Sequence, residues 1–134
     1  SIIEDYQINL NKHPNIRLIQ KRINNPEFFL SNSDIFCLPS FREGFGLSVI
    51  EASSCELPVV TSNIYGLKDC MIDGHTGLKF DHSIKNDLYN KLDLLIQNQS
   101  LREILGKNGR SYVIKKFHEN EVIEFQLNEI KKYI

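Results

Sequence analysis

The sequence predicts an α/β domain in which a mainly parallel β-sheet lies between two layers of helices. Short apolar or β-branched runs alternate with segments of helical periodicity, and turns rich in glycine or proline separate them. Repeated strand–loop–helix units are typical of Rossmann-like sheets. The chain has 134 residues, which is long enough for one hydrophobic core, so we expect residues 1–134 to belong to a single domain.

The first third of the chain predicts two helices and two strands. Residues 2–11 have apolar positions near helical spacing and predict a helix. Residues 16–19 alternate after a turn and predict a strand. Pro26 predicts the first position of a short helix, because proline is favoured there. Residues 34–38 are an apolar run stopped by Pro39, which predicts a strand buried on both faces.

The middle of the chain continues the alternation. A loop with two glycines, called here the glycine loop (residues 40–46), leads into a predicted helix over residues 47–54. Residues 58–62 predict a strand whose proline stands at the first position, where the ladder loses little. Residues 73–77 predict a turn, and residues 78–80 a short strand after it.

The remaining segments are predicted to be helical. Residues 66–71 are expected to hold a helical turn. Residues 84–97, 101–116 and 119–133 predict three helices, and Ser100 is the expected N-cap of the second.

Charge and hydropathy narrow the classes of partner. The formal net charge of −1 gives no broad basic field for nucleic acid or an anionic membrane, so no nucleic-acid partner is expected. No apolar run approaches the ~20 residues that span a bilayer. The first residues do not have the pattern of a signal peptide and read as the interior of a longer protein.

Cysteines and histidines do not predict a metal site. Cys37, Cys55 and Cys70 have no CxxC spacing and are expected to be reduced thiols in a cytosolic protein. The histidines are expected at the surface, without a nucleophile beside them: His13, His75, His82 and His118.

The glycine loop is the first candidate site, because ligands of parallel sheets bind where strands lead into helix N-termini. Gly44 and Gly46 allow unusual backbone angles and a close approach to a ligand. Free N–H groups near Gly46, Leu47 and Ser48 would face a diphosphate, helped by the helix dipole. The alternative is a strand–glycine–helix turn that binds nothing.

Glu43 and Glu51 stand on either side of this loop. At ~1.5 Å rise per helical residue they should lie roughly 10 Å apart. An ionised carboxylate can accept hydrogen bonds from two vicinal hydroxyls, so the pair suits the two ends of a sugar–diphosphate–ribose. The alternative is a solvated helix face for Glu51 and a helix-dipole partner for Glu43.

Residues 33–80 carry a series of ordered motifs: Leu38-Pro39-Ser40, Glu43-Gly44-Phe45-Gly46, Glu51-Ala52, Leu57-Pro58-Val59-Val60, Gly66, Asp73-Gly74 and Thr76-Gly77. Leu105-Gly106 and Phe117 continue the series. With these motifs the chain resembles the C-terminal, donor-binding domain of the retaining glycosyltransferases of family 4, which have the two-Rossmann-domain GT-B architecture. The likeness covers most of residues 16–118.

The resemblance implies a role for each site residue. Glu43 would be the catalytic-site carboxylate that accepts hydrogen bonds from donor-sugar hydroxyls, and Glu51 would bind the ribose hydroxyls. Backbone N–H groups would contact the sugar and diphosphate from five residues: Gly44, Phe45, Gly46, Leu47 and Ser48. Arg42 is expected to be solvated, with acceptor or phosphate contact as the alternative. No cofactor or metal is implied.

The resemblance also implies an activity. A hexosyl group would pass from a nucleotide diphosphate sugar, with uridine as the commonest nucleotide, to an acceptor hydroxyl with retention. The acceptor, a glycan or lipid-linked sugar, would bind a separate N-terminal domain, and the product would be a cell-surface polysaccharide or glycoconjugate. The enzyme would be cytoplasmic, at the inner face of the membrane. The alternatives are a non-catalytic nucleotide-sugar-binding module and a response-regulator-like domain.

Two departures from the family pattern lead to further expectations. Glu56 stands where the family usually has glycine, and we expect its carboxylate to point to solvent at a helix end. The N-terminal acceptor domain and the first two strand–helix units of the donor domain, with their Arg/Lys pair, have no counterpart in residues 1–134. In the strand order 3-2-1-4-5-6, strands 16–19 and 35–38 would then lack a neighbour. The chain alone is expected to be inactive and to self-associate through these edges.

Overall fold

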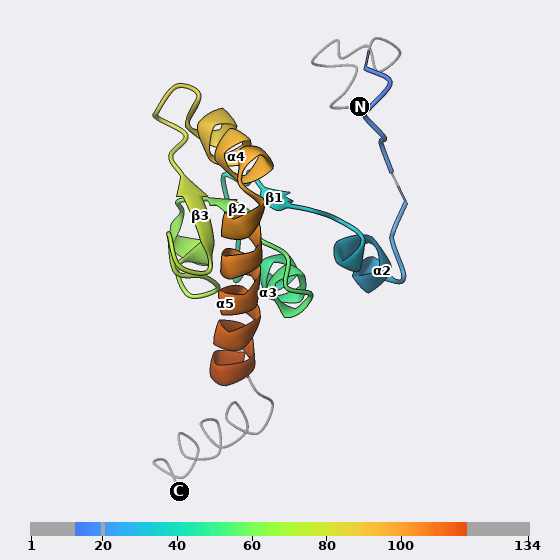
Figure 1. The fold of residues 1–134 in the computed structure, drawn as a ribbon, viewed down its shortest axis with the longest axis vertical. Helices are drawn as coiled ribbons and strands as arrows, with labels where there is room; N and C mark the ends of the chain where they lie inside the picture. Colours follow the sequence, from blue (N-terminus) through green and yellow to red (C-terminus); the bar gives the residue numbers. More distant parts are fainter. Residues whose placement is uncertain (1–12, 20, 118–134) are drawn as a thin grey trace, which may run out of the picture.

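The computed structural model describes residues 13–19 and 21–117. Within them, three parallel strands form one sheet in the order β1–β2–β3 (Figure 1). The strands are β1 (Phe36–Leu38), β2 (Val59–Ser62) and β3 (Gly77–Phe80). The sequence prediction of a parallel α/β sheet is confirmed, and the strands follow one another as the last three of the expected order.

Helices occupy the segments between and after the strands: α2 (Pro26–Ser31), α3 (Leu47–Ser54), the 3₁₀ turn η2 (Tyr65–Leu67), α4 (Asp87–Gln97) and α5 (Gln99–Phe117). Pro26 opens α2 as predicted, because its missing N–H costs nothing in a first turn. The long helix α5 packs against α3 and β3. In Figure 1 it starts at the level of the sheet and extends well below it.

Alternate side chains along the strands form a core on each face of the sheet. Under α3 the buried residues are Val49, Ala52, Leu57, Val59, Leu67, Cys70 and Met71. On the opposite face, towards α4 and the start of α5, they are Val60, Leu78, Phe80, Leu95 and Leu105. Because each face has its own helical cover, the three-layer arrangement expected from the sequence is present.

The strands differ in burial. Every residue of β2 is buried, whereas β1 is only half-buried, so the prediction that residues 34–38 are buried on both faces was wrong. The reason is position. β1 pairs with β2 along one edge, and no described strand lies along its other edge.

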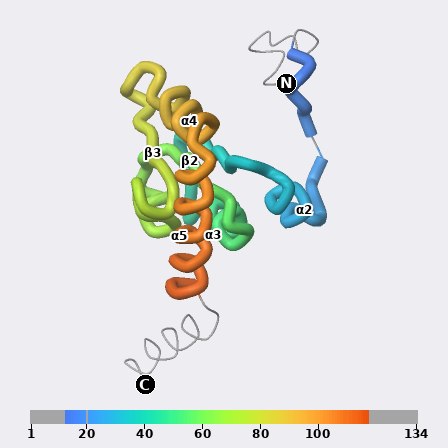
Figure 2. Tube along the Cα trace, viewed as in Figure 1, coloured from blue at the N-terminus to red at the C-terminus, as the bar shows by residue number. Residues whose placement is uncertain are grey.

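The predicted strand over residues 16–19 is also wrong. The segment has no ladder partner among the described residues, and Ile16, Leu18 and Ile19 each have about half of their surface exposed (53%, 49% and 50%). An alternating pattern becomes a strand only where a neighbour supplies hydrogen bonds and cover. Figure 2 shows this part of the chain leading away from the sheet.

In the second half of the chain, the observed helix boundaries differ from the predicted ones by a few residues. Asn98, not Ser100, caps α5, since its Oδ1 accepts a hydrogen bond from the Leu101 N–H at 2.9 Å. α4 begins at Asp87 because Asn86 has a left-handed backbone (φ 63°). The helical turn expected within residues 66–71 begins at Tyr65 as η2. The helices predicted for residues 2–11 and 119–133 lie outside the described residues.

Candidate functional site

Two serines and a histidine meet at the carboxyl edge of the sheet, where the three parallel strands end together. Ser40 follows β1, Ser62 ends β2 and His82 follows β3. The His82 Nε2 atom lies 3.0 Å from Ser62 Oγ and 3.4 Å from the Ser40 carbonyl oxygen. The glycine loop starts at this edge, which is where open α/β sheets bind their ligands.

The glycine loop ends in a helix start with free donors. Gly46 adopts a left-handed conformation (φ 72°) as the N-cap of α3, and no side chain caps it. Its carbonyl oxygen accepts from the N–H groups of Val49 and Ile50, at 2.9 and 3.3 Å. Leu47 and Ser48 occupy the first two helical positions, whose N–H groups have no intrahelical acceptor. No acidic residue lies in this first turn, so the site can accept an anion.

The two glycines of the loop have different physical roles. A Cβ atom on buried Gly46 would lie 2.5 Å from Leu67 Cδ2 and 3.2 Å from Cys70 Sγ, so only glycine fits there. A Cβ atom on exposed Gly44 would meet nothing within 4 Å. Burial raises the pKa of the Cys70 thiol against the smaller opposing effect of Lys79, so the thiol beneath the loop is neutral.

Glu43 is half-buried at the centre of the glycine loop. The Ser40 hydroxyl donates a hydrogen bond of 2.8 Å to Glu43 Oε1. This bond fixes one carboxylate oxygen and leaves the remaining lone pairs for other donors. The backbone of Gly66 in η2 packs directly against the Glu43 carbonyl oxygen, so closely that a Cβ atom at residue 66 would overlap it.

Glu51 lies exposed in the second turn of α3, away from the loop itself. It borders an open pocket of about 250 Å³ between α2 and α3, with Pro26, Leu30 and Cys55 among the other lining residues. Glu43 thus precedes the α3 N-terminus, and Glu51 lies just over one helical turn after it. They do not form one cluster.

The far end of the glycine loop is held by α5. The Phe45 ring meets the Phe117 ring edge to face, with centroids 5.7 Å apart, and Tyr112 packs on Phe117 in the same way at 6.3 Å. Lys116 lies beside these rings, and its hydrogen bond with the Tyr112 hydroxyl raises the pKa of its ammonium group, assisted by Asp69. Arg42 is exposed, as predicted.

Residues 4–112 match the sequence model of the family described as glycosyl transferases group 1. The chain belongs to this family.

Individual relatives agree with the family match. The group 1 glycosyltransferase domain is 38% identical over 124 residues to the capsular polysaccharide biosynthesis glycosyltransferase CapM of Staphylococcus aureus, covering 92% of this chain and 32% of CapM. A structure of an S. aureus TarM mutant in complex with fondaparinux, alpha-GlcNAc-glycerol and UDP superposes with a TM-score of 0.81 and 30% identity, over 95% of this chain and 25% of TarM. The chain thus spans about a third of the length of its first curated relatives.

The fold is shared more widely than the sequence. Anabaena HepE, solved in complex with UDP-glucose, superposes with a TM-score of 0.82 at 18% identity, over 98% of this chain and 37% of HepE. At this identity the likeness shows the fold alone. The Rossmann-like α/β arrangement of GT-B glycosyltransferases is therefore present here in part.

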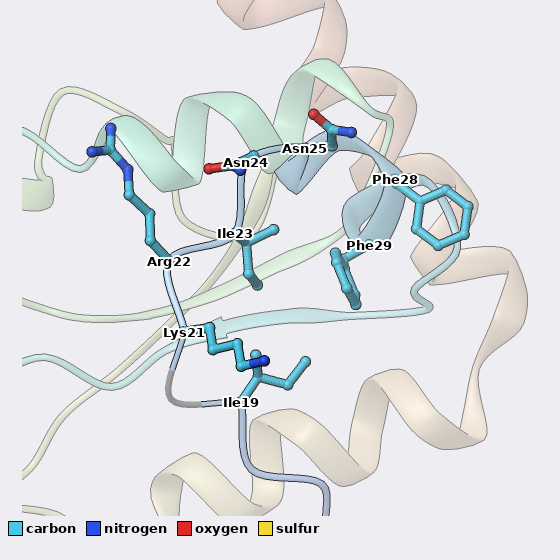
Figure 3. A pocket seen from close by; sticks show the side chains of 8 residues that line it. All are labelled: Ile19, Lys21, Arg22, Ile23, Asn24, Asn25, Phe28 and Phe29. Carbon is cyan, nitrogen blue, oxygen red and sulfur yellow. The ribbon is translucent and has the colours of Figure 1, made fainter.

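A pocket of about 400 Å³ in the glycosyltransferase domain lies away from Glu43 and Glu51 (Figure 3). Its lining residues come from the segment before α2 and from α2 itself: Ile19, Lys21, Arg22, Ile23, Asn24, Asn25, Phe28 and Phe29. In Figure 3 the Ile19, Ile23 and Phe29 side chains face a common space, while Arg22 extends away from it. These apolar side chains are exposed, so the pocket is an uncovered packing surface.

Neither a metal cluster nor a membrane-spanning helix is found in the described part of the chain. Within residues 13–19 and 21–117, no three His, Cys, Asp or Glu side chains lie close enough together to hold a metal ion. No helix in those residues is both long and apolar enough to cross a bilayer. The three cysteines are free, with Cys70 buried and Cys37 and Cys55 half-buried.

His82 is exposed, as predicted, but the sequence analysis did not identify its contacts. Its ring stacks on Phe41, with centroids 4.0 Å apart, and meets Phe80 edge to face. The available signal was its place two residues after a predicted strand, at the edge where ligands bind. Nothing in the local sequence shows that Phe41, 41 positions earlier, would lie against it.

Proposed function

We propose that this chain is the donor-binding part of a retaining glycosyltransferase of family 4, and that it holds a UDP-sugar between the glycine loop and α3. The observation that carries the proposal is the uncapped N-terminus of α3, with the Leu47 and Ser48 N–H groups free and Glu43 directly before it. Oriented backbone donors of this kind favour a diphosphate. A carboxylate beside them suits the hydroxyls of the attached sugar.

Each predicted site residue receives a role in this proposal. The Leu47 and Ser48 N–H groups bind the diphosphate, and Glu43 accepts hydrogen bonds from donor-sugar hydroxyls, with the backbone of Gly44, Phe45 and Gly46 alongside. Glu51 accepts hydrogen bonds from the ribose hydroxyls. The Ser40 hydroxyl supports the sugar contact by donating a hydrogen bond to Glu43 Oε1. This bond orients the whole carboxylate, Oε2 included.

In the proposed reaction, negative charge develops on the leaving diphosphate, beside the N–H donors of the α3 N-terminus. The bond between the anomeric carbon and the diphosphate oxygen breaks, and the acceptor oxygen bonds to the same carbon on the same face. The leaving diphosphate gains negative charge as that bond breaks, and the α3 N-terminus stabilises this charge. The acceptor proton passes to a base outside this chain, since no described histidine stands free beside Glu43. Transfer uses no metal ion in this proposal.

The rest of the enzyme lies outside this sequence in the proposal. An N-terminal domain binds the acceptor, a glycan or lipid-linked sugar, and further strand–helix units complete the donor domain beside β1. The exposed apolar surface of residues 16–29 supports this arrangement, because it is suited to packing against such units. The isolated chain is then inactive. The name of CapM, a capsular polysaccharide biosynthesis glycosyltransferase, supports a role in building cell-surface polysaccharide. The cytoplasmic location is part of the proposal.

A panel of nucleotide sugars tests the proposal in the full-length protein that carries this domain. We expect sugar transfer, or slow donor hydrolysis, with one UDP-hexose, and an α-linked product from an α-linked donor. A matched Glu43→Gln protein should bind UDP and lose most of the transfer. An inverted product would contradict retention. Nucleotide-sugar binding with no transfer or hydrolysis for any donor would favour the alternative, a non-catalytic binding module.

A further inference from the structure

We infer that His82 is a positioning residue, which holds the glycine loop in place and through Ser40 orients the Glu43 carboxylate. The positioning itself is a property of the fold, and only its effect on sugar transfer rests on the proposed function. The inference joins residues that are far apart in the sequence, on the loops after β1 and β3.

The His82 imidazole is held firmly from its own side of the sheet. Its ring meets Phe80 edge to face, with centroids 4.9 Å apart at 74°, and its Nε2 atom lies 3.0 Å from Ser62 Oγ. The preceding Asp81 carboxylate accepts hydrogen bonds from the Ser83 N–H at 2.8 Å and the Ser83 hydroxyl at 2.6 Å. These bonds hold the turn around His82, whose exposed ring is positioned by its contacts with Phe80 and Ser62.

The same ring contacts two successive residues of the glycine loop. Its Nε2 atom lies 3.4 Å from the Ser40 carbonyl oxygen, so an Nε2–H tautomer donates towards both Ser40 and Ser62. Its face stacks on the Phe41 ring, with planes 16° apart. Phe41 has 82% of its surface exposed. The loop is therefore held by one polar and one aromatic contact from His82.

Ser40 links the His82 contact to the Glu43 carboxylate. Its carbonyl oxygen faces His82, and its hydroxyl donates to Glu43 Oε1 at 2.8 Å. A shift of Ser40 therefore moves the donor that orients the carboxylate. Such a shift matters for chemistry, because a misplacement on the order of 1 Å can cost about a hundredfold in rate.

Two substitutions separate the polar contact from the aromatic one. His82→Phe keeps a ring between Phe41 and Phe80 and removes Nε2. His82→Gln loses the ring and keeps an amide nitrogen near the Nε2 position. His13→Phe is the matched control, because His13 is exposed in the segment before α2 and makes the same chemical change away from the sheet.

Amide hydrogen exchange in the full-length protein tests the positioning independently of any activity. We expect His82→Phe to speed exchange of the amides of residues 40–46 by about three- to tenfold, the effect of losing one hydrogen bond. His82→Gln loses the stack on Phe41 and keeps the polar contact, so it should speed exchange less than His82→Phe does, and His13→Phe should have no effect. Unchanged exchange in His82→Phe, or equal effects of His82→Phe and His82→Gln, would overturn the inference.

Kinetics with the preferred donor test the effect on Glu43. We expect His82→Phe to lower kcat by about three- to tenfold with little change in donor KM, and Ser40→Ala to do the same. The double variant should lose no more than the worse single variant, because both act through one path. Additive losses, or a change in KM alone, would contradict the path. A wild-type protein without transfer would refute the proposed function, while the exchange result would still decide the positioning.

Discussion

Gly66 and Glu43 are in direct backbone contact, with the Gly66 Cα facing the Glu43 carbonyl oxygen so closely that no side chain fits between them. The two residues are 23 positions apart in the sequence, on the glycine loop and on η2. This contact fixes the position of Glu43 relative to η2. It also explains physically why a glycine stands at residue 66.

Substitution of Gly66 is expected to destabilise the domain. Gly66→Ala should lower the free energy of unfolding by about 1–3 kcal/mol, because the new methyl group collides with rigid backbone. Urea unfolding followed by circular dichroism measures this change.

Gly44→Ala serves as the control in the same loop. Its Cβ atom would meet nothing within 4 Å, so its unfolding midpoint should remain close to that of wild type. Equal destabilisation by both substitutions would show that the Gly66 contact is not specific.

Glu56 occupies a position that favours glycine. It has a left-handed backbone (φ 59°) just after α3. Its N–H donates to the Ser53 carbonyl at 3.0 Å and the Leu57 N–H donates to the Ala52 carbonyl at 3.1 Å, the hydrogen-bond pattern of a Schellman motif. The prediction that Glu56 sits exposed at a helix end is confirmed.

Glu56→Gly should therefore stabilise the domain by about 0.5–1 kcal/mol, since glycine adopts this conformation without steric cost. The lost ion pair with Arg110, 3.8 Å long and about half exposed, contributes little in comparison. Glu56→Ala loses the same carboxylate and keeps the strain, so it should not stabilise. Thermal or urea unfolding of the three proteins distinguishes them, and a gain in Glu56→Ala equal to that in Glu56→Gly would point to the charge instead.

The pH dependence of the turn before α4 follows from Asp81. Hydrogen bonds from the Ser83 side chain and N–H lower the pKa of the Asp81 carboxyl below 3.8. A folded pKa below the unfolded value stabilises the folded state above the unfolded pKa, and this contribution is lost as the pH falls through the folded pKa. Carboxyl NMR titration should show Asp81 with a lowered pKa that rises in Ser83→Ala. An unchanged pKa in Ser83→Ala would contradict the assigned cause.

The isolated chain is expected to self-associate. β1 has no described strand on its outer edge, and the exposed apolar residues before it in the chain include Phe28 on α2, with 65% of its surface exposed. Light scattering should show a mass above that of the monomer, rising with concentration. Phe28→Ser should reduce this mass, whereas Tyr89→Ser, at an equally exposed ring on α4, should not. A clean monomer at high concentration would contradict the expectation.

Much of the fold could be predicted because its signals are local. Pro26 opened α2, residues 58–62 contained β2, and the strand–glycine–helix pattern placed α3 directly after Gly46. Strand 16–19 could not be predicted correctly, because its formation depends on a neighbouring strand. The prediction that β1 is buried on both faces was wrong for the same reason, since sequence alone does not show which strand lies at an edge.

The residues of the candidate site could be predicted from the sequence, but the contacts that hold Glu43 in place could not. The positions of Glu43, Gly46 and Glu51 around the α3 N-terminus follow from a motif within nine residues. The contacts that hold Glu43 come from Ser40, from Gly66 and, through Ser40, from His82. The last two are tertiary contacts over long sequence separations, and no local pattern encodes them.

The central claim is that Glu51 and the α3 N-terminus bind the nucleotide while Glu43 serves the sugar. Isothermal titration of UDP into the full-length protein tests it most directly. We expect Glu51→Ala to weaken UDP binding about ten- to a hundredfold, as for the loss of a charge-assisted hydrogen bond of ~1.5–3 kcal/mol. Glu43→Ala should bind UDP nearly as wild type, and so should the control Glu103→Ala, an exposed carboxylate on α5. Unchanged UDP affinity in Glu51→Ala would contradict the account.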